Sequence, residues 1–108
     1  MLKKGNKADT KSVERIFKTG KVLNFPNLAL RFILTGDPGV PRISFIAPKS
    51  IAKLAVKRNL LRRRGYTALG KYINQFPAGL LGVFIFKKYQ DDLSIIENEI
   101  KNILDQIN

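Results

Sequence analysis

The chain has 108 residues, the size of one small domain, and it carries 20 Lys and Arg against 8 Asp and Glu, a formal net charge of +12. Its 44% hydrophobic content excludes a disordered basic tail, and the absence of Cys and His excludes disulfide frameworks, Cys or His metal sites and Ser-His-Asp triads. Without a membrane-spanning stretch or a signal peptide pattern, we expect one domain, residues 1–108, in the cytoplasm with no membrane partner.

The first half of the chain predicts one short helix followed by three strands. Residues 9–12 (Asp-Thr-Lys-Ser) offer N-cap candidates, and Val13, Ile16 and Phe17 then place apolar side chains on one helix face. Gly20 follows as the expected C′ glycine. The β-forming residues that come next are interrupted by a Pro-Asn turn and a Gly-Asp-Pro-Gly turn. The predicted strands are residues 22–25, 28–34 and 42–47.

The second half predicts two helices and one strand. Residues 50–72 follow a helical pattern, and residues 80–86 form a continuous apolar run, which is typical of a strand buried on both faces. Asp91 and Asp92 suit the N-terminus of a final helix. That helix carries one apolar stripe, formed by Leu93, Ile96, Ile100, Ile103, Leu104 and Ile107.

The predicted element order is αβββαβα. Because a helix connects the third and fourth strands, these two are expected to be parallel, as in a βαβ unit. The fold class is therefore α+β, a single-domain α/β sandwich in which helices pack on a four-stranded mixed sheet.

The charges are segregated along the chain. Residues 38–90 contain eleven Lys or Arg and no acid, whereas residues 91–108 contain five acids and one Lys. Separation on this scale is costly unless a polyanion compensates it, because like charges repel one another. Nucleic acid is the favoured partner, and an anionic membrane is the weaker alternative because no amphipathic helix stands apart from the predicted core.

The middle helix carries the densest charge. An ideal helix places its basic residues on one stripe and a set of apolar residues on an adjacent stripe that is expected to pack on the sheet. The basic stripe comprises Lys53, Lys57, Arg64 and Lys71, and the apolar one comprises Leu54, Leu61, Ala68 and Tyr72. Because the segment itself contains no acid, it predicts phosphate contacts with RNA or DNA rather than a salt-bridged surface. Leu60 falls on the charged stripe, where an apolar side chain gains little.

Residues 47–63 resemble the signature of the protein subunit of bacterial ribonuclease P. That family shows a strand ending in Ser-Lys-Lys and then a helix with Ala-Val-x-Arg-Asn-Arg-x-Lys-Arg-x-x-Arg. Residues 13–20 are similar to the opening helix of the family, Phe-x-x-Val-Phe-x-x-Gly, so the resemblance covers nearly the whole chain. The matching positions in the signature are Lys49, Ala55, Val56, Arg58, Asn59 and Arg63, with Arg62 in place of Lys.

The chain departs from the family pattern at four positions. Val13 stands where an aromatic residue is usual, and Ser50 stands where the family has its second Lys. Leu60 replaces the second Arg of Arg-Asn-Arg, and Tyr66 replaces the last Arg.

The resemblance implies an accessory RNA-binding subunit of an endoribonuclease. In the family, a catalytic RNA removes the 5′ leader of precursor tRNA with Mg²⁺, which is held mainly by the RNA. It implies no catalytic residue in this chain, no metal bound by the protein alone and no obligate protein partner. It also implies a left-handed βαβ crossover.

The resemblance also assigns residues to two sites, one facing the catalytic RNA and one forming a cleft for the leader. The RNA-binding residues would be Lys49, Lys53, Lys57, Arg58, Asn59, Arg62, Arg63 and Arg64. The leader cleft would include Val13 and Phe17. The main alternative is a ribosomal protein that binds ribosomal RNA. A DNA-binding module and a stand-alone nuclease are less favoured, because the chain lacks a helix-turn-helix partner, His and clustered carboxylates.

Overall fold

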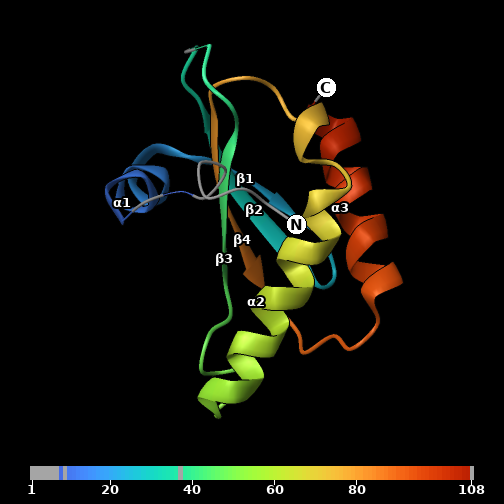
Figure 1. Cartoon of the computed structure of the whole chain (residues 1–108). Coiled ribbons are helices and arrows are strands. Elements are labelled where there is room, and N and C mark those ends of the chain that lie inside the picture. Colours follow the sequence, from blue (N-terminus) through green and yellow to red (C-terminus); the bar gives the residue numbers. More distant parts are fainter. Residues whose placement is uncertain (1–7, 9, 37, 108) are drawn as a thin grey trace.

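The computed structural model describes residue 8 and residues 10–36 and 38–107, and it has the predicted element order (Figure 1). Asp9, one of the N-cap candidates, lies outside the described residues. A short 3-10 helix that the sequence pattern did not predict follows the second helix. The elements are α1 (Thr10–Thr19), β1 (Lys21–Asn24), β2 (Leu28–Leu34), β3 (Arg42–Ile46), α2 (Ala55–Gly70), η2 (Ile73–Gln75), β4 (Leu80–Phe86) and α3 (Leu93–Ile107).

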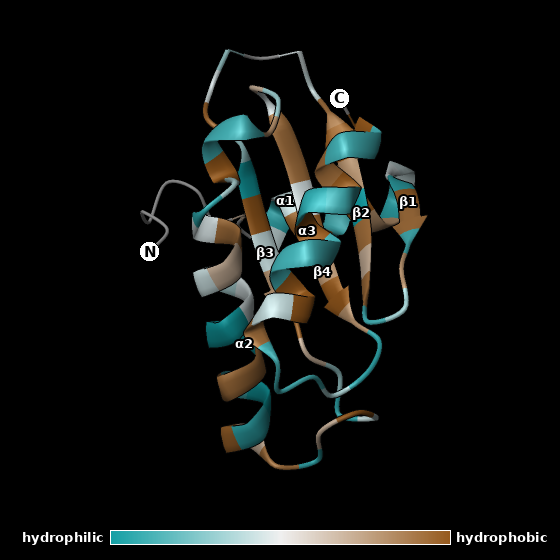
Figure 2. Cartoon of the chain, turned by 90° about the vertical axis from the view of Figure 1, so that its right-hand side faces the viewer, coloured by the Kyte–Doolittle hydropathy of each residue, from teal (hydrophilic) through white to brown (hydrophobic). Residues whose placement is uncertain are grey.

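The four strands form one mixed sheet in the order β1-β2-β4-β3. β2 pairs antiparallel with both β1 and β4, whereas β3 pairs parallel with β4, which confirms the predicted parallel pair. In Figure 2 the β4 arrow points downward, α2 lies on the viewer's side of the sheet, and the chain passes from β3 on the left to β4 on the right. The βαβ crossover is therefore left-handed, against the usual preference.

Helices cover both faces of the sheet, two on one face and one on the other (Figure 1). Figure 1 shows α2 and α3 on one face of the sheet and α1 alone on the other. The main core lies between the sheet and the two helices and includes the fully buried Leu30, Phe84, Leu61 and Ile100. On the opposite face, α1 packs on β2 and β4 and buries Ile16 completely.

The middle helix begins later than the sequence pattern indicated. Residues 50–54 form a turn in which the amides of Ile51 and Ala52 donate to the carbonyl of Pro48, at 3.2 and 3.3 Å. Leu54 is then the N-cap residue of α2 in an extended conformation, with φ −81° and ψ 132°. The predicted packing of Leu54 on the sheet is wrong, since its side chain is 62% exposed.

Two glycines, Gly65 and Gly20, lie where neighbouring atoms leave no room for a Cβ. A Cβ on Gly65 would lie 2.5 Å from the ring of Phe45, so glycine allows α2 to approach β3 closely. Gly20 does not adopt the positive φ of a C′ glycine, since Gly36 and Gly79 alone do so among the described residues. Its amide instead donates to the carbonyl of Ile16 at 2.7 Å, and a Cβ there would lie 2.4 Å from that oxygen.

Candidate nucleic-acid interface

Two cations of the predicted basic stripe, Arg64 on α2 and Lys71 directly after it, form ion pairs with acidic residues that follow β4 in the sequence. The Arg64 Nη1 atom lies 3.3 Å from Asp91 Oδ1 and also donates to the carbonyl of Gln90 at 3.3 Å. The Lys71 Nζ atom lies 2.9 Å from Glu97 Oε2 on α3. The hydrogen bond from Lys71 to Glu97 and the charge of Glu97 raise the pKa of Lys71. Part of the predicted basic stripe is therefore neutralised by acids that follow β4 in the sequence.

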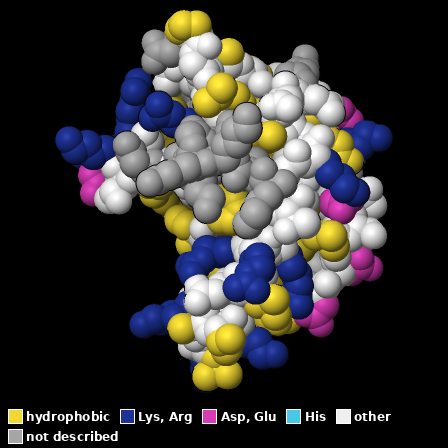
Figure 3. Space-filling view, in the orientation of Figure 1, with side chains coloured by type: hydrophobic (Ala, Val, Ile, Leu, Met, Phe, Trp, Pro, Cys, Tyr) yellow, Lys and Arg dark blue, Asp and Glu magenta, His cyan; other side chains and the backbone are white. Residues whose placement is uncertain are grey.

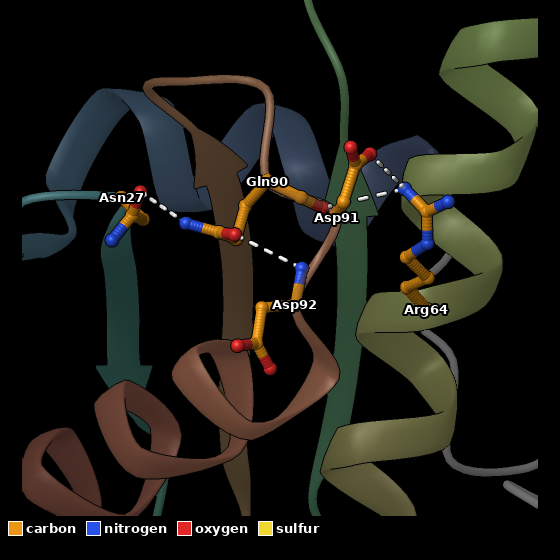
Figure 4. Close-up of polar contacts among 5 residues, drawn as sticks. All are labelled: Asn27, Arg64, Gln90, Asp91 and Asp92. Carbon is orange, nitrogen blue, oxygen red and sulfur yellow. Dashed lines mark hydrogen bonds and ion pairs between the residues drawn. The ribbon is translucent and has the colours of Figure 1, made fainter.

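A hydrogen-bond network fixes the loop that carries Asp91 (Figure 4). The Gln90 side chain donates to Asn27 Oδ1 at 3.3 Å and accepts from the backbone amide of Asp92 at 2.9 Å. Asp92 in turn accepts from the amide of Ser94 at 2.8 Å, which makes it the N-cap of α3. This loop thereby joins α3, the turn between β1 and β2, and α2.

Glu99 anchors α3 to the sheet from within the helix. It is only 8% exposed, and its carboxylate accepts from the amide of Leu28 at 3.0 Å and from the backbone and side-chain amides of Asn27. Glu99 was not among the residues predicted to have a role. Its position three residues after Ile96, inside the apolar stripe, was the available signal.

Besides Arg58, which is described below, five cations on α2 and on the turn before it have no acidic partner among the described residues. Figure 3 shows Lys and Arg side chains gathered below the centre of this face, around the start of α2. Arg62 donates to the side-chain oxygen of Asn59, which leaves its charge unneutralised. The five are Lys49, Lys53, Lys57, Arg62 and Arg63. The structure thus brings together most of the predicted RNA-binding residues and sets Arg64 apart from them.

Arg58 has a local structural contact. Its Nη1 atom donates to the carbonyls of Ala52 and Lys53, at 3.0 and 2.7 Å. These bonds fix the turn that precedes α2 and thereby position Lys53, which is exposed. The guanidinium still carries its full charge, because a carbonyl does not neutralise it.

An aromatic ring on the loop after β4 lies beside two cations of α2. Tyr89 is 36% exposed, with Lys57 Nζ 6.0 Å and Arg64 Cζ 5.9 Å from its ring centroid. Tyr89 was not among the predicted site residues. The signal for it was its position directly after Lys87 and Lys88 at the end of a strand.

The second predicted site lies on α1, across the sheet from α2. Phe17 is 41% exposed, and the guanidinium carbon of Arg31 on β2 lies 5.1 Å from its ring centroid. Arg31 also donates to the carbonyl of Phe17 at 3.4 Å, while Val13 is partly buried one turn earlier. An exposed ring beside a guanidinium suits contact with an unpaired nucleobase. Arg31 was not among the predicted residues.

Two of the four departures from the family pattern have clear surroundings. The Tyr66 hydroxyl accepts from the amide of Phe45 at 3.2 Å, and the two rings meet edge to face with centroids 5.0 Å apart. Tyr66 therefore supports β3 instead of adding a charge. Ser50 is exposed on the turn before α2.

The described part of the chain has neither a cluster of metal ligands nor a membrane-spanning helix. Within residues 8, 10–36 and 38–107, no three His, Cys, Asp or Glu side chains are grouped closely enough to hold a metal ion. Over the same described part of the chain, no helix has the length and apolar character needed to cross a membrane.

Comparison with known proteins identifies the family. The family model described as Ribonuclease P matches residues 4–108. The chain belongs to the ribonuclease P protein family. Membership makes it a protein subunit of the tRNA-processing enzyme ribonuclease P and implies a partnership with the RNA of that enzyme. It confirms the resemblance noted in the sequence and does not support the ribosomal alternative.

Solved structures share the ribonuclease P protein fold. The protein from Thermotoga maritima superposes with a TM-score of 0.80 at 21% identity, covering 94% of this chain and 97% of that one. The same protein in complex with 1-(4-fluorophenyl)-2-thiourea gives a TM-score of 0.78 at 22% identity, covering 91% and 95%. The Staphylococcus aureus protein gives 0.80 at 16% identity, covering 98% and 100%. No curated protein matches the chain in sequence.

Proposed function

We propose that this ribonuclease P protein binds both the catalytic RNA and the 5′ leader of precursor tRNA, and thereby assists removal of the leader. The observation that carries the proposal is the group of cations at the start of α2 with no acidic partner among the described residues. Arg62 and Arg63 are its arginines, and Lys49, Lys53 and Lys57 are its lysines. Arg58 and Asn59 lie between these residues and complete the RNA-binding set.

The proposed contribution is electrostatic. Two RNAs repel each other through their phosphates, and unpaired cations between them reduce that repulsion. Binding releases condensed counterions, so affinity falls steeply as salt is raised. If about five phosphates are neutralised, the slope of log affinity against log salt is on the order of −3.5 to −4.5.

The leader is assigned to the side of the molecule that carries α1. In Figure 1, α1 and α2 lie on either side of β3, which is an edge strand of the sheet. A single strand held there would meet the Phe17 ring, with Arg31 beside it and Val13 one turn earlier. Stacking on Phe17 tolerates any base, which suits leaders of varied sequence.

The proposal assigns the Mg²⁺ ions and the cleavage step to the RNA. Among the described residues the donor set does not fit a metal centre, because their acids are not grouped in threes. We therefore give the protein no step through the metal and no catalytic residue. Its described side chains bind and orient the RNA.

Reconstitution tests the proposal. The purified chain is added to its partner RNA at limiting Mg²⁺, and 5′ cleavage of precursor tRNA is measured with wild type, with Arg62→Gln/Arg63→Gln and with Arg64→Gln/Lys71→Gln. Both double variants lose the same charge. We expect wild type to stimulate cleavage, the first variant to lose most of that stimulation and the second to retain it. Cleavage no faster than with RNA alone would overturn the proposal.

A further inference from the structure

An apolar hollow lies within the cationic surface of α2. Val56 and Leu60 stand one turn apart on the side of the helix that faces away from the sheet. Val56 is 68% exposed and Leu60 is partly buried. With Lys57, Asn59 and Arg63 they line a hollow of about 390 Å³. This volume lies within the range of small-ligand sites, roughly 300–1,000 Å³.

A second hollow lies next to this one. The neighbouring hollow, of about 270 Å³, shares Leu60 and Arg63 and continues over Arg64, Thr67 and Leu93. Both hollows lie along α2, and Leu60 lines each of them. Leu60 is also the position at which the family signature carries an arginine, so the apolar character that they share comes from a departure in this chain.

The lining of the hollow favours one kind of occupant. Phosphate gains nothing from Val56 and Leu60, whereas the flat face of a nucleobase gains contact with both apolar side chains. Lys57 and Arg63 lie at the rim, where the phosphates on either side of such a base would pass. The Asn59 side chain adds amide hydrogen-bonding groups at the same rim.

We propose that the Val56–Leu60 hollow accepts one unpaired nucleobase of an RNA partner, with Lys57 and Arg63 holding the adjoining phosphates. The proposal rests on the RNA-binding function proposed above and adds a ligand that the charges alone do not specify. An unpaired base is required because only a base freed from its duplex exposes its face to a protein side chain.

The test compares a short oligouridine with an abasic ribose-phosphate chain of the same length. Wild type is expected to bind oligouridine about tenfold more tightly than the abasic chain, since burial of apolar surface contributes roughly 25 cal/mol per Å² and covering about 55 Å² of base and side chain gives that factor. In a Phe17→Ala background, which removes the base contact proposed on α1, Leu60→Ala and Leu60→Arg should abolish most of this preference. Leu60→Arg should at the same time bind the abasic chain more tightly, because it adds a cation.

Further variants separate a local effect from a loss of fold. Val56→Ala changes a side chain that is 68% exposed and should reduce the base preference about threefold without altering unfolding. Ile95→Ala, at an exposed position on α3, should leave the preference unchanged.

Two outcomes would overturn the inference. One is a tighter binding of Leu60→Arg to both chains by the same factor, which would make the surface a plain phosphate contact. The other is an unchanged preference in Leu60→Ala and Val56→Ala, as expected if a protein occupied the hollow. In either case reconstituted cleavage would still report separately on the proposed function.

Discussion

Three consecutive arginines on α2 have different surroundings. Arg64 is 23% exposed at its side chain and pairs with Asp91, whereas Arg62 and Arg63 have no acidic partner within the described residues. The difference follows from helix geometry, because each residue is rotated by about 100° from the one before. Arg64 therefore points to the loop before α3, and its two neighbours point elsewhere. A run of charge in the sequence overstates the charge that remains available to a ligand.

The largest expected effect comes from removing the Glu99 carboxylate, which holds α3, and with it Glu97, beside α2. Glu99→Ala leaves the buried amides of Asn27 and Leu28 without their acceptor, which should lower the free energy of unfolding by about 3 kcal/mol. Urea unfolding measures this loss. Glu97→Ala, on the same helix, removes only the ion pair with the exposed Lys71 and should cost much less than Glu99→Ala. Equal losses in the two variants would contradict the role of Glu99.

The next effect separates the two sets of cations by RNA affinity. Arg62→Gln/Arg63→Gln should weaken binding to the partner RNA about ten- to a hundredfold at low salt, because two phosphate contacts are lost. It should also make the salt slope shallower by about 1.4–1.8. Arg64→Gln/Lys71→Gln removes the same charge and should change affinity less than about threefold. Fluorescence anisotropy across a salt series gives both values, and equal losses would show that pairing does not matter.

A third effect concerns the close contact between Gly65 of α2 and the Phe45 ring of β3. Gly65→Ala should lower the free energy of unfolding by about 1–2 kcal/mol although alanine favours helices, since the new Cβ meets the Phe45 ring. Phe45→Leu, which removes the ring, should make the loss at residue 65 smaller in the double variant. Chemical denaturation of the four proteins in this cycle provides the test. Strict additivity would show that the Phe45 ring is not the obstacle.

The smallest effect is a pH dependence of the stability that the ion pair between Lys71 and Glu97 provides. Because Glu97 raises the pKa of Lys71, their pair stabilises the folded protein below the ordinary pKa of 10.5 and loses this contribution as pH rises through the higher folded value. Lys71→Gln should therefore lower the melting temperature slightly near neutral pH and not at all well above pH 10.5. A difference that grew with pH would have the wrong sign.

Much of the fold followed from local pattern. The strand predicted at residues 80–86 has the bounds of β4, since a continuous apolar run has few other interpretations. The start of α2 was misplaced, because residues 50–54 fit a helical period although the amides of Ile51 and Ala52 bond to the carbonyl of Pro48 in a turn. Local periodicity does not reveal which hydrogen bonds a segment makes at its end.

The site was only partly predictable for a different reason. Lys57, Arg62 and Arg63 were predicted from charge alone; they have no acidic partner among the described residues, and their contact with RNA stays a prediction. The pairing of Arg64 depends on Asp91, which lies 27 residues further along the chain. Such a contact depends on how α3 returns across the sheet, and no spacing rule within α2 contains that information.

The hydrogen bond between the Tyr66 hydroxyl and the Phe45 amide has a consequence for solubility. β3 borders the sheet, and an unprotected border strand is a template on which strands of other molecules can add and aggregate. The phenol occupies a backbone donor that an incoming strand would need. Tyr66, which stands where the family has an arginine, therefore also disfavours self-association of this basic protein through the edge strand β3.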